Sequence, residues 1–179
     1  MKIVHIAAGG TIEGYAPEYK EIGKLAGIFA DASDISKYIT ESFRFGGKYT
    51  LEIACKKDSR KINKSDREKI LKIILKHYKK NVRHFLITHG TYTMPETGIF
   101  LLKKLPKEIK ENVSIVITGS MYPLNLIGSD ALLNIGASIS SLYNTHPSGV
   151  IVCMHGKNWD PLTIRKDADK LIFEEKAIG

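Results

Sequence analysis

The sequence predicts an α/β protein with a doubly wound, mostly parallel sheet of five strands and helices on both faces. Short apolar segments rich in β-branched residues recur along the chain, and segments with helical apolar spacing lie between them. The continuous apolar run at residues 113–118 is typical of a strand buried on both faces, as parallel strands are. A chain of 179 residues then forms one domain, residues 1–179.

The expected strands follow one another with a helix between most of them. The first begins at Lys2 and ends in a glycine pair, and four more cover residues 49–55, 84–88, 113–118 and 149–154. The segment after Leu171 is a candidate for a last short strand, and residues 155–161 are expected to form the loop that leaves the fifth strand. Each of the main strands delivers polar residues to a loop at its carboxyl end.

The expected helices are marked by capping residues. Asp31 with Ser33 or Asp34 suits the start of a short helix through Tyr38 and Ile39. A second helix is expected to open with a capping box from Ser65 to Glu68, and a third begins at Pro95. A fourth, capped by Ser129 and Asp130, covers residues 131–143.

The loop after the third expected strand is rich in hydroxyl groups. It carries His89 among four threonines, Thr88, Thr91, Thr93 and Thr97. Ligands of open α/β sheets bind at the carboxyl ends of the strands, where helix amino termini also favour anions. This loop is therefore a candidate binding site, although each single threonine could equally serve only to cap the helix.

A second loop of the same kind follows the first strand, where the sequence reads Gly9-Gly10-Thr11-Ile12. A glycine pair at this position is a weak signal by itself. It lacks both the full dinucleotide fingerprint and the Gly-Lys-Ser/Thr of a phosphate-binding loop. Residues 13–30 have no clear period and are expected to form a flexible loop, with residues 14–28 acting as a lid.

The net charge of +8 comes largely from Lys and Arg at residues 56–83 and 103–110. We weighed a nucleic-acid surface, but the lysines at residues 64–80 lie opposite an apolar stripe and alternate with acids, which favours a solvated helix face. Nucleic acid is therefore not an expected partner, although the basic charge could attract anionic substrates.

Cys55 and Cys153 have no metal-ligand spacing and lie in apolar strands, so we expect buried free thiols and no metal. The first residues do not resemble a signal peptide, and no apolar stretch is long enough to span a bilayer. These features predict a cytoplasmic protein without a membrane partner.

Taken together, the two threonine loops resemble the amino-terminal domain of the L-asparaginase family of threonine amidohydrolases. Further matches fall in order along the chain: Asp58-Ser59, Thr118-Gly-Ser-Met-Tyr-Pro123, Ser129-Asp130 with Asn134, and Trp159-Asp160 leading to Lys166. The resemblance implies a flavodoxin-like domain that hydrolyses the side-chain amide of asparagine, or a related small amide, to an acid and ammonia without a cofactor.

The resemblance also implies roles for particular residues. The catalytic ones are Thr11, Thr91, Lys166 and a loop tyrosine, for which Tyr19 fits the spacing better while Tyr15 stays open. The substrate-binding ones are Gly10, Asp58, Ser59, Gly90, Tyr92 and Ser120. A threonine hydroxyl needs a base, and Lys166 would be competent if burial beside Thr91 and the charge of Arg165 lowered its pKa. Arg60 or Lys57 could add charge to the pocket. Backbone N–H groups near Thr91 and Gly119 could hold the oxyanion.

Two departures from the family pattern bear on the substrate. Tyr92 replaces the acid that binds the α-ammonium group of asparagine, and Asp58, Glu13, Glu96 and Asp160 are candidates to replace it. Tyr122 replaces an arginine. The family's second domain has no counterpart in this sequence, so a homodimer is expected to close the site. The alternatives are an amidase for another small amide or lactone, a non-catalytic amino-acid binding module, and a component of a transfer-RNA amidotransferase system.

Overall fold

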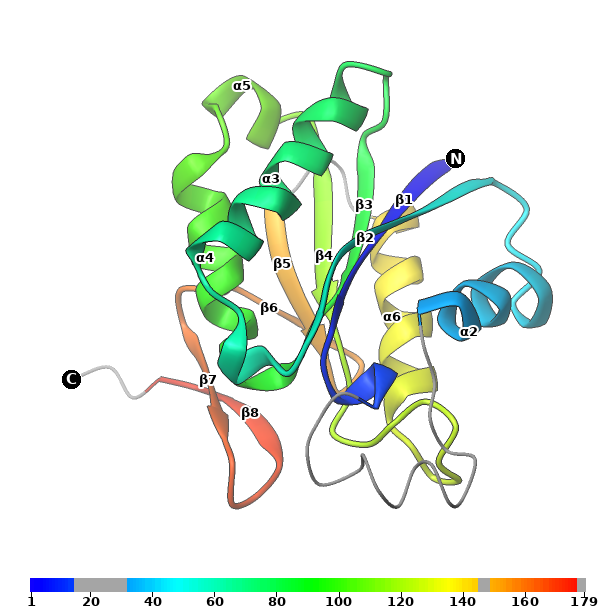
Figure 1. Cartoon of the computed structure of the whole chain (residues 1–179), viewed down its shortest axis with the longest axis vertical. Helices are drawn as coiled ribbons and strands as arrows, with labels where there is room; N and C mark the ends of the chain where they lie inside the picture. Colours follow the sequence, from blue (N-terminus) through cyan, green and yellow to red (C-terminus); the bar gives the residue numbers. More distant parts are fainter. Residues whose placement is uncertain (15–31, 145–148, 177–179) are drawn as a thin grey trace.

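The structure is a computed structural model that describes residues 1–14, 32–144 and 149–176. Its centre is a six-stranded sheet with strand order β2-β1-β3-β4-β5-β6 (Figure 1). The strands of this sheet are β1 (Lys2–Gly9), β2 (Lys48–Lys57), β3 (His84–Thr88), β4 (Ser114–Thr118), β5 (Gly149–Met154) and β6 (Lys157–Trp159). A separate two-stranded sheet pairs β7 (Ile164–Asp167) with β8 (Ile172–Glu175), so the predicted strand after Leu171 is present.

The five strands β1 to β5 all run parallel, which confirms the predicted fold class. Their carboxyl ends therefore meet at one edge of the sheet, the lower edge in Figure 1. The sixth strand was not predicted, because residues 155–161 were expected to be a loop. His155 and Gly156 both have positive φ, 57° and 70°, which suits a two-residue hairpin turn, so β6 folds back antiparallel onto β5.

Helices cover both faces of the sheet, as Figure 1 shows. One face packs against α3 (Lys64–Tyr78) and α4 (Met94–Lys104), and the other against α2 (Ala32–Lys37) and α6 (Ala131–Asn144). Each face has its own core. Ile70, Ile74 and Leu101 belong to the first, and Ile35, Ile135 and Leu142 belong to the second. The short α5 (Lys107–Lys110) follows α4.

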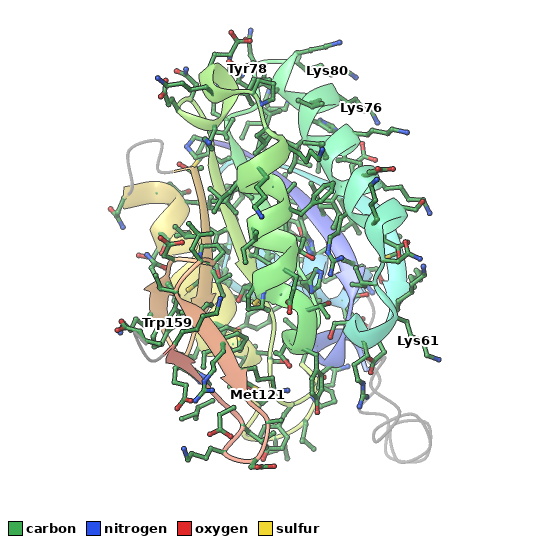
Figure 2. All side chains as sticks on the ribbon, turned by 90° about the vertical axis from the view of Figure 1, so that its left-hand side faces the viewer. Lys61, Lys76, Tyr78, Lys80, Met121 and Trp159 are labelled. Atoms are coloured by element: carbon green, nitrogen blue, oxygen red, sulfur yellow. The ribbon has the colours of Figure 1, made fainter. Side chains whose placement is uncertain are left out.

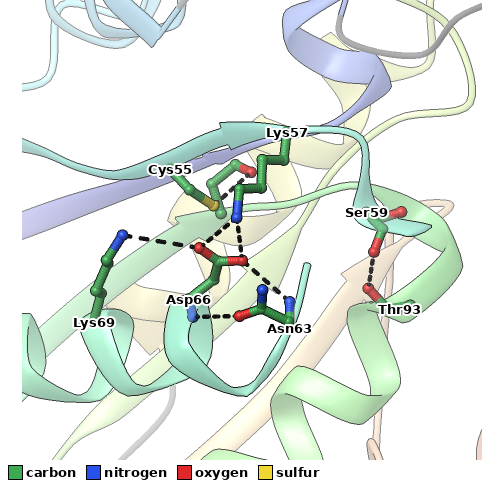
Figure 3. A network of polar contacts seen from close by, with 8 residues as sticks. Cys55, Lys57, Ser59, Asn63, Asp66, Lys69 and Thr93 are labelled. Carbon is green, nitrogen blue, oxygen red and sulfur yellow. Dashed lines mark hydrogen bonds and ion pairs between the residues drawn. The ribbon is translucent and has the colours of Figure 1, made fainter. Parts of the chain in front are cut away.

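The capping box of α3 lies two residues before the predicted one. The side chain of Asn63 accepts a hydrogen bond from the Asp66 backbone N–H, and the Asp66 carboxylate accepts one from the Asn63 N–H. Ser65 is exposed. The buried Asp66 carboxylate also accepts two hydrogen bonds from the Lys57 ammonium, at 2.7 and 2.9 Å (Figure 3). Lys57 thus supports the start of this helix.

The other predicted helices agree with the structure in part. Pro95 lies in the first turn of α4, as expected. At α6 the Ser129 hydroxyl accepts the Ala131 N–H, as predicted, but the Asp130 carboxylate accepts the N–H groups of Met121 and Tyr122. Asp130 therefore fixes the loop after β4. The first short helix also extends further than expected, because α2 continues as a π-helix, η2 (Tyr38–Ser42).

The basic charge lies on solvated surfaces. Lys61, Lys76 and Lys80 project outward along and beside α3 in Figure 2, and the exposed Lys76 ammonium pairs with Glu52 at 2.8 Å. In the described ranges both cysteines are buried free thiols, as predicted. No helix within these ranges is long and apolar enough to cross a membrane.

Candidate active site

The carboxyl ends of β1 and β3 meet at two glycines. The backbones of Gly10 and Gly90 touch: a Cβ atom on Gly10 would lie 2.3 Å from the Gly90 Cα, and one on Gly90 would lie 2.6 Å from the Ser59 Cβ. Only glycine fits such an approach, and Gly10 also has φ of 92°. Thr11 begins the 3-10 helix η1 (Thr11–Glu13), and Thr91 begins η4 (Thr91–Thr93). Each threonine therefore directly follows one of the two touching glycines.

The hairpin β7–β8 brings a lysine to this edge. The Lys166 ammonium lies 2.8 Å from the Thr91 hydroxyl oxygen, and Thr91 is 2% exposed. Side chains two residues apart on a strand point to the same side. Ile164 is fully buried in the core next to α4, so Lys166 points inward as well. This places the two residues in the contact that the sequence predicted.

Tyr92 stands between two cations. Its ring centroid lies 3.8 Å from the Lys166 ammonium and 4.8 Å from the Arg60 guanidinium. Arg60 also donates to both carboxylate oxygens of Asp58, at 3.0 and 2.8 Å. Desolvation alone would raise the pKa of Asp58, but the hydrogen bonds from Arg60 outweigh it and lower that pKa. Asp58 is therefore neutralised by Arg60, which conflicts with its expected role as the acid that replaces position 92.

The remaining predicted binding residues lie in the loops at this edge. The Ser59 hydroxyl, in η3 (Ser59–Lys61), accepts the Tyr92 N–H at 3.1 Å, and the Ser59 carbonyl accepts the Thr93 hydroxyl at 2.7 Å (Figure 3). Ser120 is fully buried after β4 and donates its hydroxyl to the Tyr122 carbonyl. The expected pocket charge from Lys57 is wrong, because its ammonium binds Asp66 beside α3.

His89 is a structural residue of the threonine loop. It is fully buried, and burial lowers its pKa to about 4, so the ring is neutral at pH 7. Its Nδ1–H donates to the Gly90 carbonyl at 2.8 Å, and its Nε2 contacts the Thr97 hydroxyl at 2.9 Å. Arg67 donates to the same hydroxyl. Thr93 and Thr97 thus hold the loop together through other contacts, and the capping alternative is wrong for their side chains, because Thr93 is the N-cap of α4 without a side-chain cap hydrogen bond and its hydroxyl donates to the Ser59 carbonyl.

A cavity of about 400 Å³ opens beside the Thr91–Lys166 contact, between the start of α4 and the β7–β8 hairpin. It is lined by Tyr92, Pro95, Glu96, Ile99, Ile164, Arg165, Lys166 and Lys176. Its charged lining is mostly basic. Within the described residues no group of three or more His, Cys, Asp or Glu side chains is arranged to hold a metal ion. Tyr15, Tyr19 and the predicted lid after Gly14 lie outside the described residues.

Sequence reasoning missed a buried polar network behind this site: it left out His5, and it named Glu13 only as a candidate acid and Thr88 only as a loop threonine. Glu13, His5 and Thr88 are fully buried and are joined by hydrogen bonds. The sequence offered only a weak signal for them, which is a histidine in an otherwise apolar strand and a glutamate two residues after Thr11. Their contacts join positions far apart in the chain.

The chain is an open parallel α/β sheet with threonine and lysine side chains at its carboxyl edge, which is the edge where sheets of this class bind their ligands. The chain belongs to the asparaginase family, because the family model described as "Asparaginase, N-terminal" matches residues 2–171. This confirms the resemblance that the two threonine loops indicated.

Individual relatives agree with the family match. The probable L-asparaginase 4 of Schizosaccharomyces pombe is 30% identical over 102 residues, which are 55% of this chain and 28% of that protein. The glutaminase-asparaginase of Pseudomonas fluorescens biotype A is 31% identical over 97 residues, 52% of this chain and 24% of that protein. The matches thus span about a quarter of each curated relative.

Solved structures show the same fold. The probable cytoplasmic L-asparaginase of Campylobacter jejuni superposes with a TM-score of 0.74 and 26% identity, over 92% of this chain and 48% of that one. The thermostable L-asparaginase of Thermococcus kodakarensis gives a TM-score of 0.73 and 23% identity, over 98% of this chain and 51% of that one. The chain therefore covers about half of each solved relative.

Proposed function

We propose that this chain is an asparaginase-type amidohydrolase that uses a threonine nucleophile on a small linear amide. The observation that carries the proposal is the 2.8 Å contact between Lys166 Nζ and Thr91 Oγ1, next to the Gly10–Gly90 contact from which Thr11 leaves. A threonine hydroxyl needs a neighbouring base or a polarising group, and a lysine in direct contact can supply one.

The proposed reaction has two steps. The Thr11 hydroxyl oxygen attacks the amide carbonyl carbon, its proton passes through the loop tyrosine to the amide nitrogen, and the C–N bond breaks to release ammonia. Water then attacks the ester carbonyl carbon, and the Thr91–Lys166 pair, with Lys166 as the neutral amine, takes one proton of the water. That proton reaches the Thr11 oxygen as the ester C–O bond breaks and the acid leaves. Backbone N–H groups near Thr91 and Gly119 would hold the oxyanion in both steps. Ser59 would orient the substrate carboxylate, with Gly10, Gly90 and Ser120 shaping the pocket around it.

The test measures ammonia release from asparagine, glutamine, succinamic acid and small neutral amides. We expect Lys166→Met and Thr91→Val each to lower kcat by about a hundredfold or more, as the loss of an acid–base group does. Lys170→Met is the matched control, because Lys170 lies in the turn of the same hairpin and its exposed ammonium pairs with Asp167. Turnover that survives both Lys166→Met and Thr11→Val would refute the proposal. Ligand binding without turnover by the unchanged protein would instead support a binding module.

The charges around Tyr92 favour one substrate class within this activity. Arg60 and Lys166 flank the ring, and Arg165, Lys166 and Lys176 line the adjoining cavity. These positive charges would attract a substrate carboxylate and repel an α-ammonium group. They therefore favour an amide that carries a carboxylate but no α-ammonium group. Succinamic acid, which is asparagine without its amino group, is the member of the panel that fits this description.

We also propose that the protein acts as a homodimer in the cytoplasm. Tyr92 is 41% exposed beside the Thr91–Lys166 contact, so a second copy placed against this edge would shield the site from water. The Campylobacter jejuni relative is described as cytoplasmic, which supports the compartment. Light scattering tests the assembly, and a monomer with full amidase activity would contradict it.

A further inference from the structure

A chain of hydrogen bonds runs beneath the turn that carries Thr11. The Thr88 hydroxyl oxygen lies 3.3 Å from Glu13 Oε1 and 2.8 Å from His5 Nε2. His5 Nδ1 lies 2.5 Å from the hydroxyl oxygen of Tyr49. The chain thus connects η1 through β3 and β1 to β2, and its first three members are fully buried. The four residues of this hydrogen-bond chain come from four different elements. No local sequence motif therefore produces the arrangement.

With Glu13 ionised, this chain of hydrogen bonds has a single direction. A carboxylate oxygen only accepts, so the one proton of the Thr88 hydroxyl points to Glu13. Thr88 must then accept from His5, which places the imidazole proton on Nε2 and leaves Nδ1 to accept the Tyr49 O–H. Burial lowers the pKa of His5 to about 3, so its ring is neutral and carries the single proton that this direction requires. Tyr49 is bonded in turn to the Ser36 side chain of α2.

The acidic end of the chain holds the turn before Thr11. Glu13 Oε1 also accepts the Gly9 backbone N–H at 3.2 Å. Gly9 and Gly10 have φ of 85° and 92°, and Gly10 presses on Gly90, so this turn depends on contacts from outside it. We propose that Glu13 is a positioning residue for Thr11: its buried, ionised carboxylate fixes the Gly9–Gly10 turn and is itself held by Thr88, His5 and Tyr49.

The inference rests on the proposed function only where it concerns turnover. A protonated Glu13 would donate to Thr88, which would then donate to His5 Nε2 and leave the imidazole proton on Nδ1. The tautomer of His5 therefore reports the charge of Glu13, whether or not the protein hydrolyses any amide.

The first experiment is nitrogen NMR of the full chain labelled with ¹⁵N-histidine. We expect His5 to be neutral at pH 7 with its proton on Nε2 and to resist protonation down to pH 5. A proton on Nδ1 would overturn the inference. This measurement needs no variant, so it stays decisive even if substitutions at Glu13 prevent folding.

The second experiment compares Glu13→Met with Glu13→Gln. Gln keeps an acceptor oxygen for Gly9 and Thr88, whereas Met removes it. We expect Glu13→Met to lower kcat for the best amide by about a hundredfold with KM changed by less than about threefold, because a nucleophile displaced by an ångström loses rate of this order. Glu13→Gln should recover at least about tenfold of that loss. Glu108→Gln, on the exposed face of α5, is the control and should behave as the unchanged protein.

The same variants provide a second measurement, the tautomer of His5, which a purely structural role of Glu13 would leave unchanged. In Glu13→Met the Thr88 hydroxyl is released to donate to His5 Nε2, so the His5 proton should move to Nδ1. In Glu13→Gln it should stay on Nε2. An unchanged His5 tautomer in Glu13→Met, or full kcat in that variant, would overturn the inference. Absence of turnover in the unchanged protein would refute the proposed function alone.

Discussion

We propose that Tyr92 decides which amide the site accepts, because its ring lies beside Lys166 and Arg60 where the family places an acid. A substrate ammonium group there would lack a partner, and Asp58 does not serve, since Arg60 binds it. We expect Tyr92→Asp to raise kcat/KM for asparagine relative to succinamic acid by about tenfold or more, which corresponds to ~1.4 kcal/mol.

The measurement is the ratio of the two kcat/KM values, in the unchanged protein and in the variant. Tyr92→Phe is the matched control, because it keeps the aromatic ring and adds no charge. Efficient asparagine hydrolysis by the unchanged protein, lost in Tyr92→Asp, would show instead that the tyrosine is a working part of the site.

At the scale of single residues, the sequence predicted the positions of those residues that belong to recognisable motifs. Thr91 and Lys166 are in contact as expected, although 75 positions separate them, because each stands in a matching motif. Asp58 was assigned to the pocket by the family resemblance, and Lys57 was named as an alternative to Arg60 for adding charge there. Their partners, Arg60 and Asp66, depend on side-chain directions that a one-dimensional pattern does not contain.

Helix α3 gives the clearest prediction at the scale of elements. Its capping box pairs Asn63 with the buried Asp66, whereas Ser65 is exposed. We expect Asn63→Ala to lower the free energy of unfolding by about 1 kcal/mol, the usual cost of a lost N-cap. Ser65→Ala should change it by less than about 0.5 kcal/mol. Urea unfolding of both variants makes the comparison, and an equal loss in the two would contradict this assignment.

The parallel strands and major helices could be predicted because their apolar periodicity is strong. The position of the capping box could not, because Ser65-Asp-Arg-Glu68 fits the usual motif, whereas Asn63 and Asp66 lack its glutamate or glutamine. Burial of Asp66 against Lys57 selects the second. Strand β6 was missed for a related reason: its three residues carry no period, and the turn of His155 and Gly156 forms it.

For the whole molecule, two buried neutral histidines predict how stability depends on pH. Burial lowers the pKa of His5 to about 3 and that of His89 to about 4, from 6.5. Between about pH 6 and pH 4.5 the unfolded chain therefore binds protons that the folded one refuses, so stability falls as the pH falls. With two such groups the slope should approach about 2.7 kcal/mol per pH unit near pH 5.

Urea unfolding at several pH values from 7 to 5 measures this slope. His5→Gln should remove about half of it, since one of the two groups is gone. Ser65→Ala provides the control, because it removes no titratable group and lies on the surface, and it should leave the slope unchanged. A free energy of unfolding that stays constant from pH 7 to pH 5 would show that the two rings are protonated in the folded protein.

The β7–β8 hairpin has a consequence for how the protein loses activity. Among the strands that the structure describes, β7 and β8 pair with each other alone, and the buried side chains of Ile164 and Phe173 dock the hairpin on the core. A hairpin of this size is marginally stable alone, so it should open locally at a lower free energy than the main sheet. Amide hydrogens of β7 should exchange with solvent before those of β3 and β4. Lys166 would then separate from Thr91 while the helices are still folded. Hydrolysis should therefore stop at a urea concentration below the one at which the far-ultraviolet circular dichroism signal is lost.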